Sequence, residues 1–351
     1  MKKYSNIGNS ITKNAIVAGD GKNIVKNALL YLKKKTTWVP AENSTLFKGV
    51  YYDSEKLGSY ITKAINKNKQ KGIIKIQLRP LDFDEGYIMR QIDKHSKSKR
   101  IRMPKIISDK AWNEEDGFGY IIFEDLSHLP DVWRKSPTLK KDRKLHAVFL
   151  NEFINKFIPI EPWFQRPEKK LKEIAKKQFF HFSKIARHSN HKHIEWNEIE
   201  KMQKAYFEIL DRKKLSKLHF THGHLSGKDI KYDKNKDQFI LMANLYWSYR
   251  QVYQEISFPV WVDIMHIRDS DYSLDKALKR IESWNSFWQN NIYDHNPIDT
   301  EYYWINLLER SMLTTMLDIG SSEWPKQEKA EMQALLNTWK DLFYWIFENK
   351  L

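Results

Sequence analysis

The most informative segment of this chain reads Thr221-His222-Gly223-His224-Leu225-Ser226-Gly227-Lys228-Asp229-Ile230. It is a polar loop in which glycines permit tight turns, and it carries an imidazole at His224 and a carboxylate at Asp229. The apolar run Phe239-Ile240-Leu241-Met242 follows and predicts a short buried strand that ends just before Asn244. Three side chains with useful chemistry therefore gather around one loop and one strand end, which marks a candidate site.

The composition indicates a folded, soluble chain. It has 351 residues, of which 41% are hydrophobic and 14% aromatic, enough for a large core. The absence of cysteine excludes disulfides, thiolate metal sites and cysteine chemistry. The apolar run 15–18 is too short for a signal peptide, and no run is long enough to span a membrane. We therefore expect a cytoplasmic protein.

The chain is basic, with a net charge of +16 from 60 basic and 44 acidic residues. Such an excess favours an anionic partner, which could be a nucleotide, a nucleic acid or an acidic membrane surface. The alternative is that lysine fills the surface without a specific role. We favour this alternative, because most of the excess is lysine spread along the chain, whereas phosphate and base recognition relies more on arginine.

The order of predicted elements divides the chain into three parts. Residues 1–44 form a basic N-terminal extension with one helix, and residues 45–126 form a small lobe of short strands with one helix. Residues 127–351 are mostly helical and contain a strand-rich insert at 219–247. We expect an α+β fold with a small β-rich N-terminal lobe and a larger helical C-terminal lobe.

In that order of elements, the loop resembles a known motif. The aminoglycoside phosphotransferase and choline-kinase-like branch of the protein-kinase-like fold commonly shows H-G-D-x-x-x-x-N, then a strand, then I-D-W or I-D-F. The corresponding stretches here are His222-Gly223-His224-x4-Asp229 and Met242-Ala243-Asn244-Leu245-Tyr246. The resemblance covers roughly residues 45–265. It implies ATP and Mg²⁺ as cofactors, a nucleotide bound between two lobes, and a small-molecule hydroxyl as phosphoryl acceptor.

Lys75 is the second specific point of resemblance. It lies in Ile73-Ile74-Lys75-Ile76-Gln77, which is similar to the V-A-I-K strand whose lysine holds the α- and β-phosphates. A lysine among branched apolar residues needs a partner, since an unpaired buried charge is costly, and Glu85 in the next helix is the natural one. The alternative is a lysine on an edge strand that points to water.

The resemblance also implies nucleotide contacts that the sequence supports less specifically. Gly58 and Ser59 lie in the segment that would cover the phosphates, although a single glycine is equally typical of an ordinary hairpin. The backbone from Glu124 to Leu126 would meet the adenine edge, although any core strand that enters a turn has this pattern.

At the motif itself, the residue types depart from the family. His224 takes the position of the base, although a loop histidine could equally bond to backbone. Asp229 and Asn244 take the two metal positions with the carboxylate and the carboxamide exchanged. Because a carboxamide offers one neutral oxygen where a carboxylate can bridge two ions, we expect weaker Mg²⁺ binding.

Two further patterns surround the motif. Arg250, Tyr253 and Glu255 could brace the loop from the next helix, or could belong to a surface helix start. His219, His222 and His224 have the H-x-H spacing of a zinc site, but no further ligand set is near in sequence, so we interpret the spacing as incidental.

The sequence leaves three hypotheses about function and does not identify an acceptor. The first is a pseudokinase or atypical kinase that binds nucleotide with weak or absent phosphoryl transfer. The second is an active ATP-dependent small-molecule kinase with His224 as base. The third, which we do not favour, is a basic binding protein for nucleic acid or an anionic surface.

Overall fold

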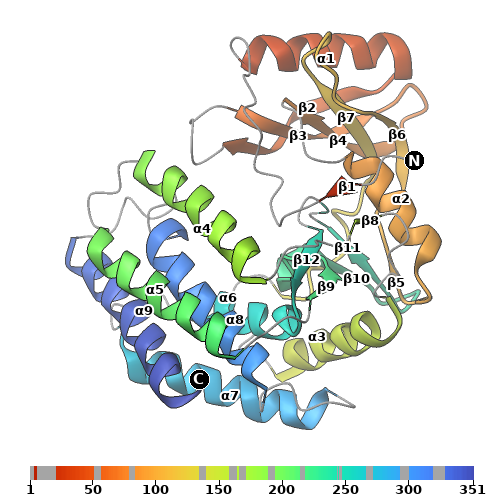
Figure 1. Ribbon diagram of the computed structural model, residues 1–351. Coiled ribbons are helices and arrows are strands. Elements are labelled where there is room, and N and C mark those ends of the chain that lie inside the picture. The colour runs from red at the N-terminus through yellow and green to blue at the C-terminus, as the bar shows by residue number, and fades with distance from the viewer. Residues whose placement is uncertain are drawn as a thin grey trace.

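A computed structural model of the chain shows two unequal lobes, a sheet-rich one near the N-terminus and a larger helical one after it (Figure 1). The predicted α+β, bilobal fold is confirmed. The structure describes residues 4–5, 21–50, 57–78, 84–133, 140–157, 164–165, 171–188, 194–213, 218–242, 244, 247–265, 272–292, 300–318 and 329–351.

The N-terminal lobe is built on an antiparallel sheet with the strand order β2-β3-β4-β7-β6. Its strands are β2 (Val39–Val50), β3 (Leu57–Ile65), β4 (Lys71–Gln77), β6 (Ile106–Lys110) and β7 (Gly119–Glu124). β4 therefore lies in the middle, with a hydrogen-bonded neighbour on each side.

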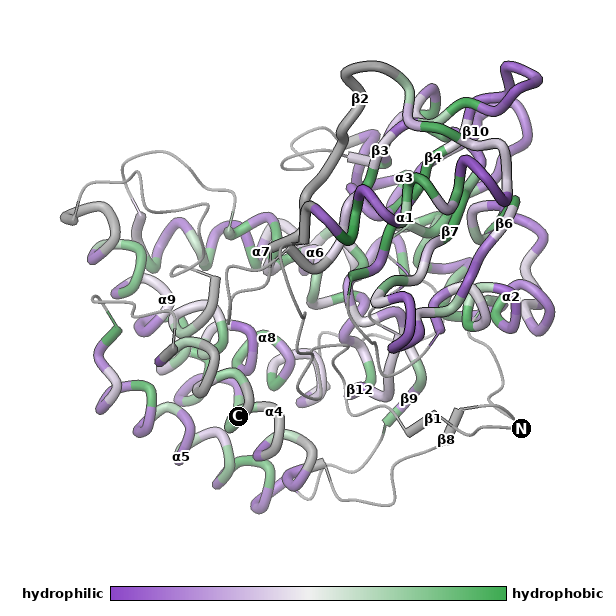
Figure 2. Tube along the Cα trace, turned by 90° about the horizontal axis from the view of Figure 1, so that it is seen from above, coloured by the Kyte–Doolittle hydropathy of each residue, from purple (hydrophilic) through white to green (hydrophobic). Residues whose placement is uncertain are grey.

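Helix α1 (Gly21–Thr36) covers one face of this sheet. The residues of β4 alternate between the two faces, and the even-numbered ones, Ile74 and Ile76, are fully buried in a cluster with Ala28 and Leu32 of α1. In Figure 2 the tube of β4 and β7 has mostly hydrophobic colouring, whereas that of α1 is mixed. The odd-numbered residues of β4 consequently face the other side of the sheet.

Helix α2 (Glu85–His95) belongs to both lobes. Asp84 caps its start by accepting a hydrogen bond from the Tyr87 amide at 3.0 Å. The buried side chains of the helix, Ile88, Met89 and Ile92, belong to the hydrophobic core of the C-terminal lobe. The position of α2 is therefore set by packing against the C-terminal lobe as well as by its own N-terminal cap.

The C-terminal lobe is an assembly of helices around an aromatic core. Its helices are α3 (Lys140–Glu152), α4 (Leu171–His188), α5 (Trp196–Arg212), α6 (Gln254–Met265), α7 (Leu274–Asn291), α8 (Glu301–Leu313) and α9 (Lys329–Asn349). Turns of π-helix extend α3 through Phe157 and α8 through Asp318. Trp284, Trp288 and Trp339 are buried here, which places them in the core.

Short strands fill the space between the sheet and these helices. They are β1 (Tyr4–Ser5), β5 (Ile101–Arg102), β8 (Phe164–Gln165), β9 (Leu218–Thr221), β10 (Ile230–Asp233), β11 (Gln238–Leu241) and β12 (Ser248–Gln251). β9 pairs with β12, and β10 pairs with β11, which in turn pairs in parallel with β5. The candidate loop lies between β9 and β10.

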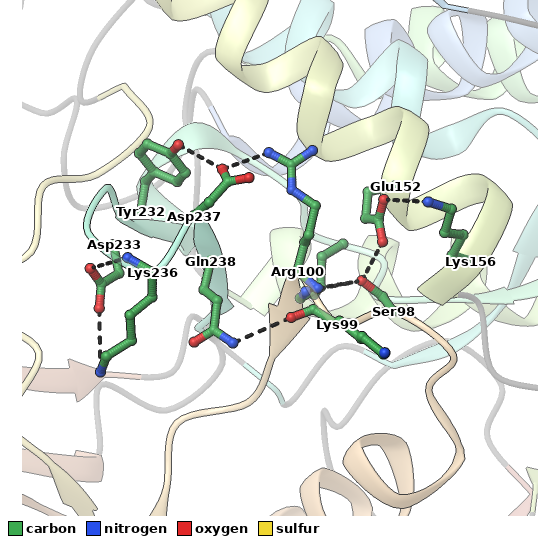
Figure 3. Close-up of polar contacts among 11 residues, drawn as sticks. Ser98, Lys99, Arg100, Glu152, Lys156, Tyr232, Asp233, Lys236, Asp237 and Gln238 are labelled. Atoms are coloured by element: carbon green, nitrogen blue, oxygen red, sulfur yellow. Dashed lines mark hydrogen bonds and ion pairs between the residues drawn. The ribbon is translucent and has the colours of Figure 1, made fainter.

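The segment after α2, residues 96–102, joins the two lobes (Figure 3). The Ser98 hydroxyl donates to the Glu152 carboxylate at 2.7 Å and accepts from two backbone amides of its own turn. Arg100 pairs with Asp237 at 2.6 Å, in the turn between β10 and β11. The sheet-rich lobe is thus connected to α3 and to the β10–β11 hairpin that follows the candidate loop.

Two boundaries differ from the sequence-based expectation. The apolar run 261–265 predicts a helix that begins near Trp261, whereas α6 begins at Gln254, because Pro259 is accommodated inside the helix. The run Val50-Tyr51-Tyr52 predicts a separate short strand, whereas Val50 is the last residue of β2, and residues 51 and 52 lie outside the described part. Within the described residues, no helix is long and apolar enough to cross a membrane.

Candidate functional site

Lys75 and Glu85 form a buried ion pair behind the central strand. Lys75 projects from the face of β4 opposite α1, and its Nζ lies 2.6 Å from Oε2 of Glu85, the first residue of α2. The two side chains are only 11% and 4% exposed. The predicted contact is therefore present, and the edge-strand alternative is wrong, because β4 lies between β3 and β7. Their role toward a phosphate stays a prediction.

Gly58 and Ser59 lie at the start of β3, where the sheet begins after the β2–β3 connection. Ser59 pairs with Gln77, two residues along β4 from Lys75, and so lies on the same face of the sheet as Lys75. Residues 51–56, which make the connection, lie outside the described part. A covering role for Gly58 and Ser59 stays a prediction.

Glu124 ends β7, and its side chain is held within the protein. The carboxylate pairs with the Arg102 guanidinium and accepts from the Lys105 amide at 2.7 Å. The Leu126 carbonyl accepts from the Leu129 amide at 3.0 Å. Contact with an adenine would therefore use other backbone groups of this turn, and the predicted hinge role stays a prediction.

Two hydrogen bonds connect the candidate loop to the strand end that follows it. His222 is fully buried, and its Nε2 donates to the Met242 carbonyl at 2.8 Å. Burial lowers the pKa of His222 to about 4, so the ring is neutral near pH 7. The Met242 amide donates to the Asp229 carbonyl at 2.7 Å. The loop and the segment that leads to Asn244 therefore form one unit.

Within that unit, Asp229 holds His224. Three donors converge on Asp229 Oδ2: His224 Nδ1 at 2.9 Å, the Ser226 amide at 3.1 Å and the Ser226 hydroxyl at 2.6 Å. Burial raises the pKa of Asp229, but the His224 ring and the Ser226 hydroxyl outweigh burial and lower it overall. The carboxylate is therefore ionised, and the proton shared with His224 lies on Nδ1, which leaves Nε2 as the basic nitrogen.

Asn244 is buried, with 2% exposure. Its Oδ1 accepts from the Trp247 indole N–H at 3.0 Å, and its Nδ2 donates to the Leu241 carbonyl at 2.9 Å. Trp247 is itself stacked on Phe220 in the core. The side chain of Asn244 is thus part of a local network that shapes the strand end.

The fit to a magnesium ion can be judged from these contacts. Magnesium prefers several oxygen ligands at close to octahedral geometry. Oδ2 of Asp229 already accepts three hydrogen bonds, and the only side-chain oxygen of Asn244 accepts one. One oxygen of each side chain is therefore already engaged within the protein, and the metal role of Asp229 and Asn244 stays a prediction.

The predicted bracing of the loop by Glu255 differs in detail from the expectation. Glu255 is buried, so the surface alternative is wrong, and it lies 2.6 Å from His219 Nε2 on β9. Burial raises the pKa of Glu255, but His219 and Thr221 lower it overall. The contact to the loop itself comes from Gln254, whose Nε2 donates to the Gly223 carbonyl at 3.3 Å.

The three histidines of the H-x-H pattern do not share a ligand set. His219, His222 and His224 contact Glu255, Met242 and Asp229 respectively. Across the described residues, no group of three or more histidine, aspartate or glutamate side chains could hold a metal ion. The zinc interpretation has no support in this part of the chain.

Sequence reasoning missed Phe258 and Arg310. The Phe258 ring lies against the His224 ring with a centroid distance of 4.9 Å, and the Arg310 guanidinium lies over Phe258 at 5.0 Å. Phe258 follows Gln254 by one helical turn, so a correct helix start would have predicted that both residues lie on the same face of α6. The pairing with Arg310 on α8 has no local signal.

Comparison with known proteins shows which solved structures share the fold of this chain. No protein-family model and no curated protein matches the sequence. Many solved structures are similar to this one, and three of them illustrate the likeness. A choline kinase from Streptococcus pneumoniae matches with a TM-score of 0.52 and 12% identity, over 92% of this chain and 99% of that one. An amicoumacin kinase has a TM-score of 0.55 and 12% identity, with coverage of 94% and 96%. A microcompartment-associated aminopropanol kinase has a TM-score of 0.54 and 10% identity, with coverage of 92% and 96%.

Proposed function

Because the chain has the kinase-like fold of small-molecule kinases and phosphotransferases, we propose that it binds a nucleoside triphosphate and transfers the γ-phosphoryl group weakly or not at all. The acceptor would be the hydroxyl group of a small molecule. The proposed protein is thus a pseudokinase or atypical kinase. The alternative is an active ATP-dependent kinase of a small molecule.

The observation that carries the proposal is the Lys75–Glu85 ion pair. A buried ion pair is expensive to form and is weak evidence for stability, so its presence on a central strand calls for another reason. The Lys75 ammonium group has three N–H donors. One of them donates a hydrogen bond to Glu85 at 2.6 Å, and this bond orients the group. The remaining N–H bonds are suited to the α- and β-phosphates of a nucleotide.

Weak transfer is supported by the contacts of Asp229 and Asn244. When bound, a divalent ion neutralises charge on the β- and γ-phosphates, which is a large part of catalysis in this reaction class. Oδ2 of Asp229 already accepts hydrogen bonds from His224 and Ser226, and Oδ1 of Asn244 accepts one from Trp247. An ion bound to these oxygens would compete with the hydrogen bonds, so we expect low Mg²⁺ affinity.

Any transfer that does occur would use the His224–Asp229 pair. The acceptor hydroxyl gives its proton to His224 Nε2 as its oxygen bonds to the γ-phosphorus. The bond from that phosphorus to the β–γ bridging oxygen breaks, and the nucleoside diphosphate leaves. Asp229 stabilises the resulting imidazolium through its bond to Nδ1.

A thermal-shift experiment tests nucleotide binding. We expect ATP at 100 times its dissociation constant to stabilise the protein by about 2.7 kcal/mol, with only a small further effect of Mg²⁺. Lys75→Ala should abolish the shift. Lys71→Ala is the matched control, because Lys71 lies on the same strand but is exposed. An unchanged ATP shift in Lys75→Ala, or no shift with any nucleotide in the parent protein, would refute the proposal.

The nucleic-acid hypothesis has less support. The basic helix α4 would be a natural phosphate-binding surface, but two of its cations have partners within the protein. Lys172 pairs with Asp211, and Arg187 stacks on Trp196 at 4.0 Å. Binding to DNA or RNA that weakens steeply with salt would revive that hypothesis.

A further inference from the structure

Helix α1 presents a basic surface to solvent on the outside of the N-terminal lobe. Its inner residues Ala28 and Leu32 are buried against the sheet, and the helix lies on the side of the sheet away from the helical lobe (Figure 1). Lys26 and the three lysines at 33–35 are exposed. A partner could therefore contact this surface without approaching Lys75, which projects from the other face of the sheet.

The hairpin between β3 and β4 adds lysines beside the last turn of α1. Strand β2 starts three residues after α1 ends, and its first residue, Val39, pairs with Ile65 at the base of this hairpin. Lys67, Lys69 and Lys71 of the hairpin are all exposed. The hairpin lysines and the C-terminal end of α1 consequently lie at the same end of the sheet.

The charge of this region is not balanced by its own carboxylates. The stretches 21–50 and 57–78 contain eleven lysines, no arginine and one acidic residue, Glu42. Lys75 is paired with Glu85. In the described part of the chain, the exposed lysines of α1 and of the hairpin form no ion pair. The region therefore carries an excess of positive charge.

An acidic loop lies on the other flank of α1. Residues 114–116 contain three carboxylates, in the connection that follows Lys110. The Nζ of Lys110 is 4.7 Å from the centre of the Tyr31 ring, which shows that this loop meets α1 on the side of Tyr31. Tyr31 is two residues from Lys33, and two residues turn an α-helix by about 200°. The three carboxylates thus reduce the charge opposite Lys33 rather than beside it.

An apolar groove lies on the flank of Lys33, between α1 and the edge strand β2. Its volume is about 340 Å³, and Leu30 on its border is 49% exposed. The groove is lined by Val25, Lys26, Leu29, Leu30, Lys33, Val39 and Pro40. Exposed apolar side chains and unpaired lysines therefore share one surface, which consists of this flank of α1 and the β3–β4 hairpin and is called here the lysine face.

The composition of the lysine face favours a lipid surface over other anionic partners. Lysine without arginine supplies charge but not the planar donor pattern that recognises phosphates and bases individually. A peptide that added to the edge strand would lack a donor at Pro40. A basic helix with exposed apolar residues is, in contrast, typical of proteins that lie at the interface of anionic membranes.

We infer that the lysine face docks on the surface of an anionic lipid bilayer. Leu30 and the groove would contact the boundary between headgroups and acyl chains, while the lysines of α1 and of the hairpin lie among the lipid charges. The inference does not depend on the proposed function, because the lysine face and Lys75 are on opposite sides of the sheet.

Co-sedimentation with vesicles tests the inference on the full-length protein. One set of vesicles contains phosphatidylcholine with about 30% phosphatidylglycerol, and the other contains phosphatidylcholine alone. We expect the protein to bind the anionic vesicles, to bind the neutral ones far less, and to dissociate as the salt concentration rises, because salt screens exposed charges. Addition of ATP should not change the partition coefficient.

Two variants separate the contributions of charge and apolar contact. The triple variant Lys26→Gln/Lys33→Gln/Lys34→Gln should lower the partition coefficient roughly 100-fold, since each lysine near an anionic surface contributes comparably. Leu30→Gln should lower it roughly 5-fold to 10-fold, as expected for the loss of a partly inserted leucine.

The matched control removes the same charge elsewhere. Lys141 and Lys144 of α3 and Lys279 of α7 are exposed, and both helices lie on the far side of the molecule from α1 (Figure 1). The triple variant Lys141→Gln/Lys144→Gln/Lys279→Gln has the same net charge as the first one. It should bind the anionic vesicles nearly as well as the parent protein.

Each of the following outcomes would overturn the inference. The first is equal binding to both kinds of vesicle, and the second is an equal loss of binding in the two triple variants. The third is an unchanged partition coefficient in Leu30→Gln. The fourth is tighter binding to a single-stranded RNA or to polyglutamate than to the vesicles at the same concentration of negative charge, which would assign the lysine face to another polyanion.

Discussion

The environment of Asn244 illustrates how one atom changes the role of a residue. A carboxamide can accept from Trp247 and donate to the Leu241 carbonyl at the same time, and Asn244 does both. An ionised carboxylate has no donor for the Leu241 carbonyl. The carboxamide at this position therefore suits a hydrogen-bonded strand end better than a carboxylate would.

Asn244→Asp should consequently destabilise the protein in the absence of a divalent ion. We expect a loss of about 1–3 kcal/mol in the free energy of unfolding, because a buried carbonyl loses its donor and a charge is added at a residue that is 2% exposed. Mg²⁺ should restore part of it. Urea unfolding with and without Mg²⁺ measures both effects.

The double variant His224→Asp/Asn244→Asp returns both positions to the residue types of the resembling motif. It should bind Mg²⁺ more tightly than the parent protein in a direct titration. Equal or weaker affinity would mean that these positions do not form a metal site.

His222 provides a test by pH. Its folded-state pKa of about 4 lies below the value of about 6.5 for a free histidine, so the unfolded chain takes up a proton that the folded chain does not. Stability should therefore fall as the pH drops from 6.5 to 4, by about 1.4 kcal/mol per pH unit for this residue. His146, buried with a pKa of about 3, adds a similar slope.

His222→Gln should remove the contribution of His222 while keeping a donor for the Met242 carbonyl. His128→Gln, at an exposed position, is the control. Chemical denaturation at a series of pH values measures the slope, and an unchanged slope in His222→Gln would contradict a buried neutral ring.

At the scale of elements, the path of the candidate loop depends on the close packing of its backbone at Gly227 against the ring of Trp133. A Cβ built on Gly227 would lie 2.4 Å from the ring of Trp133, which itself donates from Nε1 to the buried His146. Gly227 is therefore required for space rather than for backbone freedom.

Gly227→Ala should shift the loop or Trp133 and destabilise the protein by about 1–3 kcal/mol, as overpacking does elsewhere. Lys228→Ala, on the exposed neighbouring residue, should have little effect. Thermal unfolding distinguishes the two, and equal melting temperatures would show that the ring has room to move.

The elements themselves were largely predictable from local patterns. Helices α4 and α5 follow the 3.6-residue periodicity closely, and the central strand follows from its branched apolar residues. The start of α6 was missed because proline usually interrupts a helix. β5 has two residues and exists only through its pairing with β11, which no local signal predicts.

The side chains of the site were harder to predict for a related reason. The Lys75–Glu85 contact follows from adjacent elements on one face of a sheet. The bond from Trp247 to Asn244 depends on the path of a loop, and the stacking of Arg310 on Phe258 joins residues more than one helix apart in sequence. Such contacts are set by tertiary packing.

At the scale of the molecule, Ser98 is central to the connection between the lobes. Its hydroxyl donates to Glu152 and accepts from the amides of Arg100 and Ile101, so its loss leaves several polar groups without partners. The Arg100–Asp237 pair beside it is substantially exposed and should contribute less.

Ser98→Ala should therefore destabilise the protein by about 1–3 kcal/mol and reduce the protection of α2 against hydrogen exchange. Asp237→Ala serves as the control and should cost about 1 kcal/mol or less. Exchange rates measured by mass spectrometry test this, and unchanged protection of α2 in Ser98→Ala would contradict the connecting role.

The packing of α2 also determines how this protein can be divided for experiments. Ile88, Met89 and Ile92 are buried by residues of the C-terminal lobe, so a fragment that stops after Leu126 would expose all three to solvent. Such a fragment should aggregate during expression rather than accumulate as a folded piece. Attempts to separate the two halves, or to exchange one half with that of another protein, should succeed only if α2 and its partners in the helical half are transferred together.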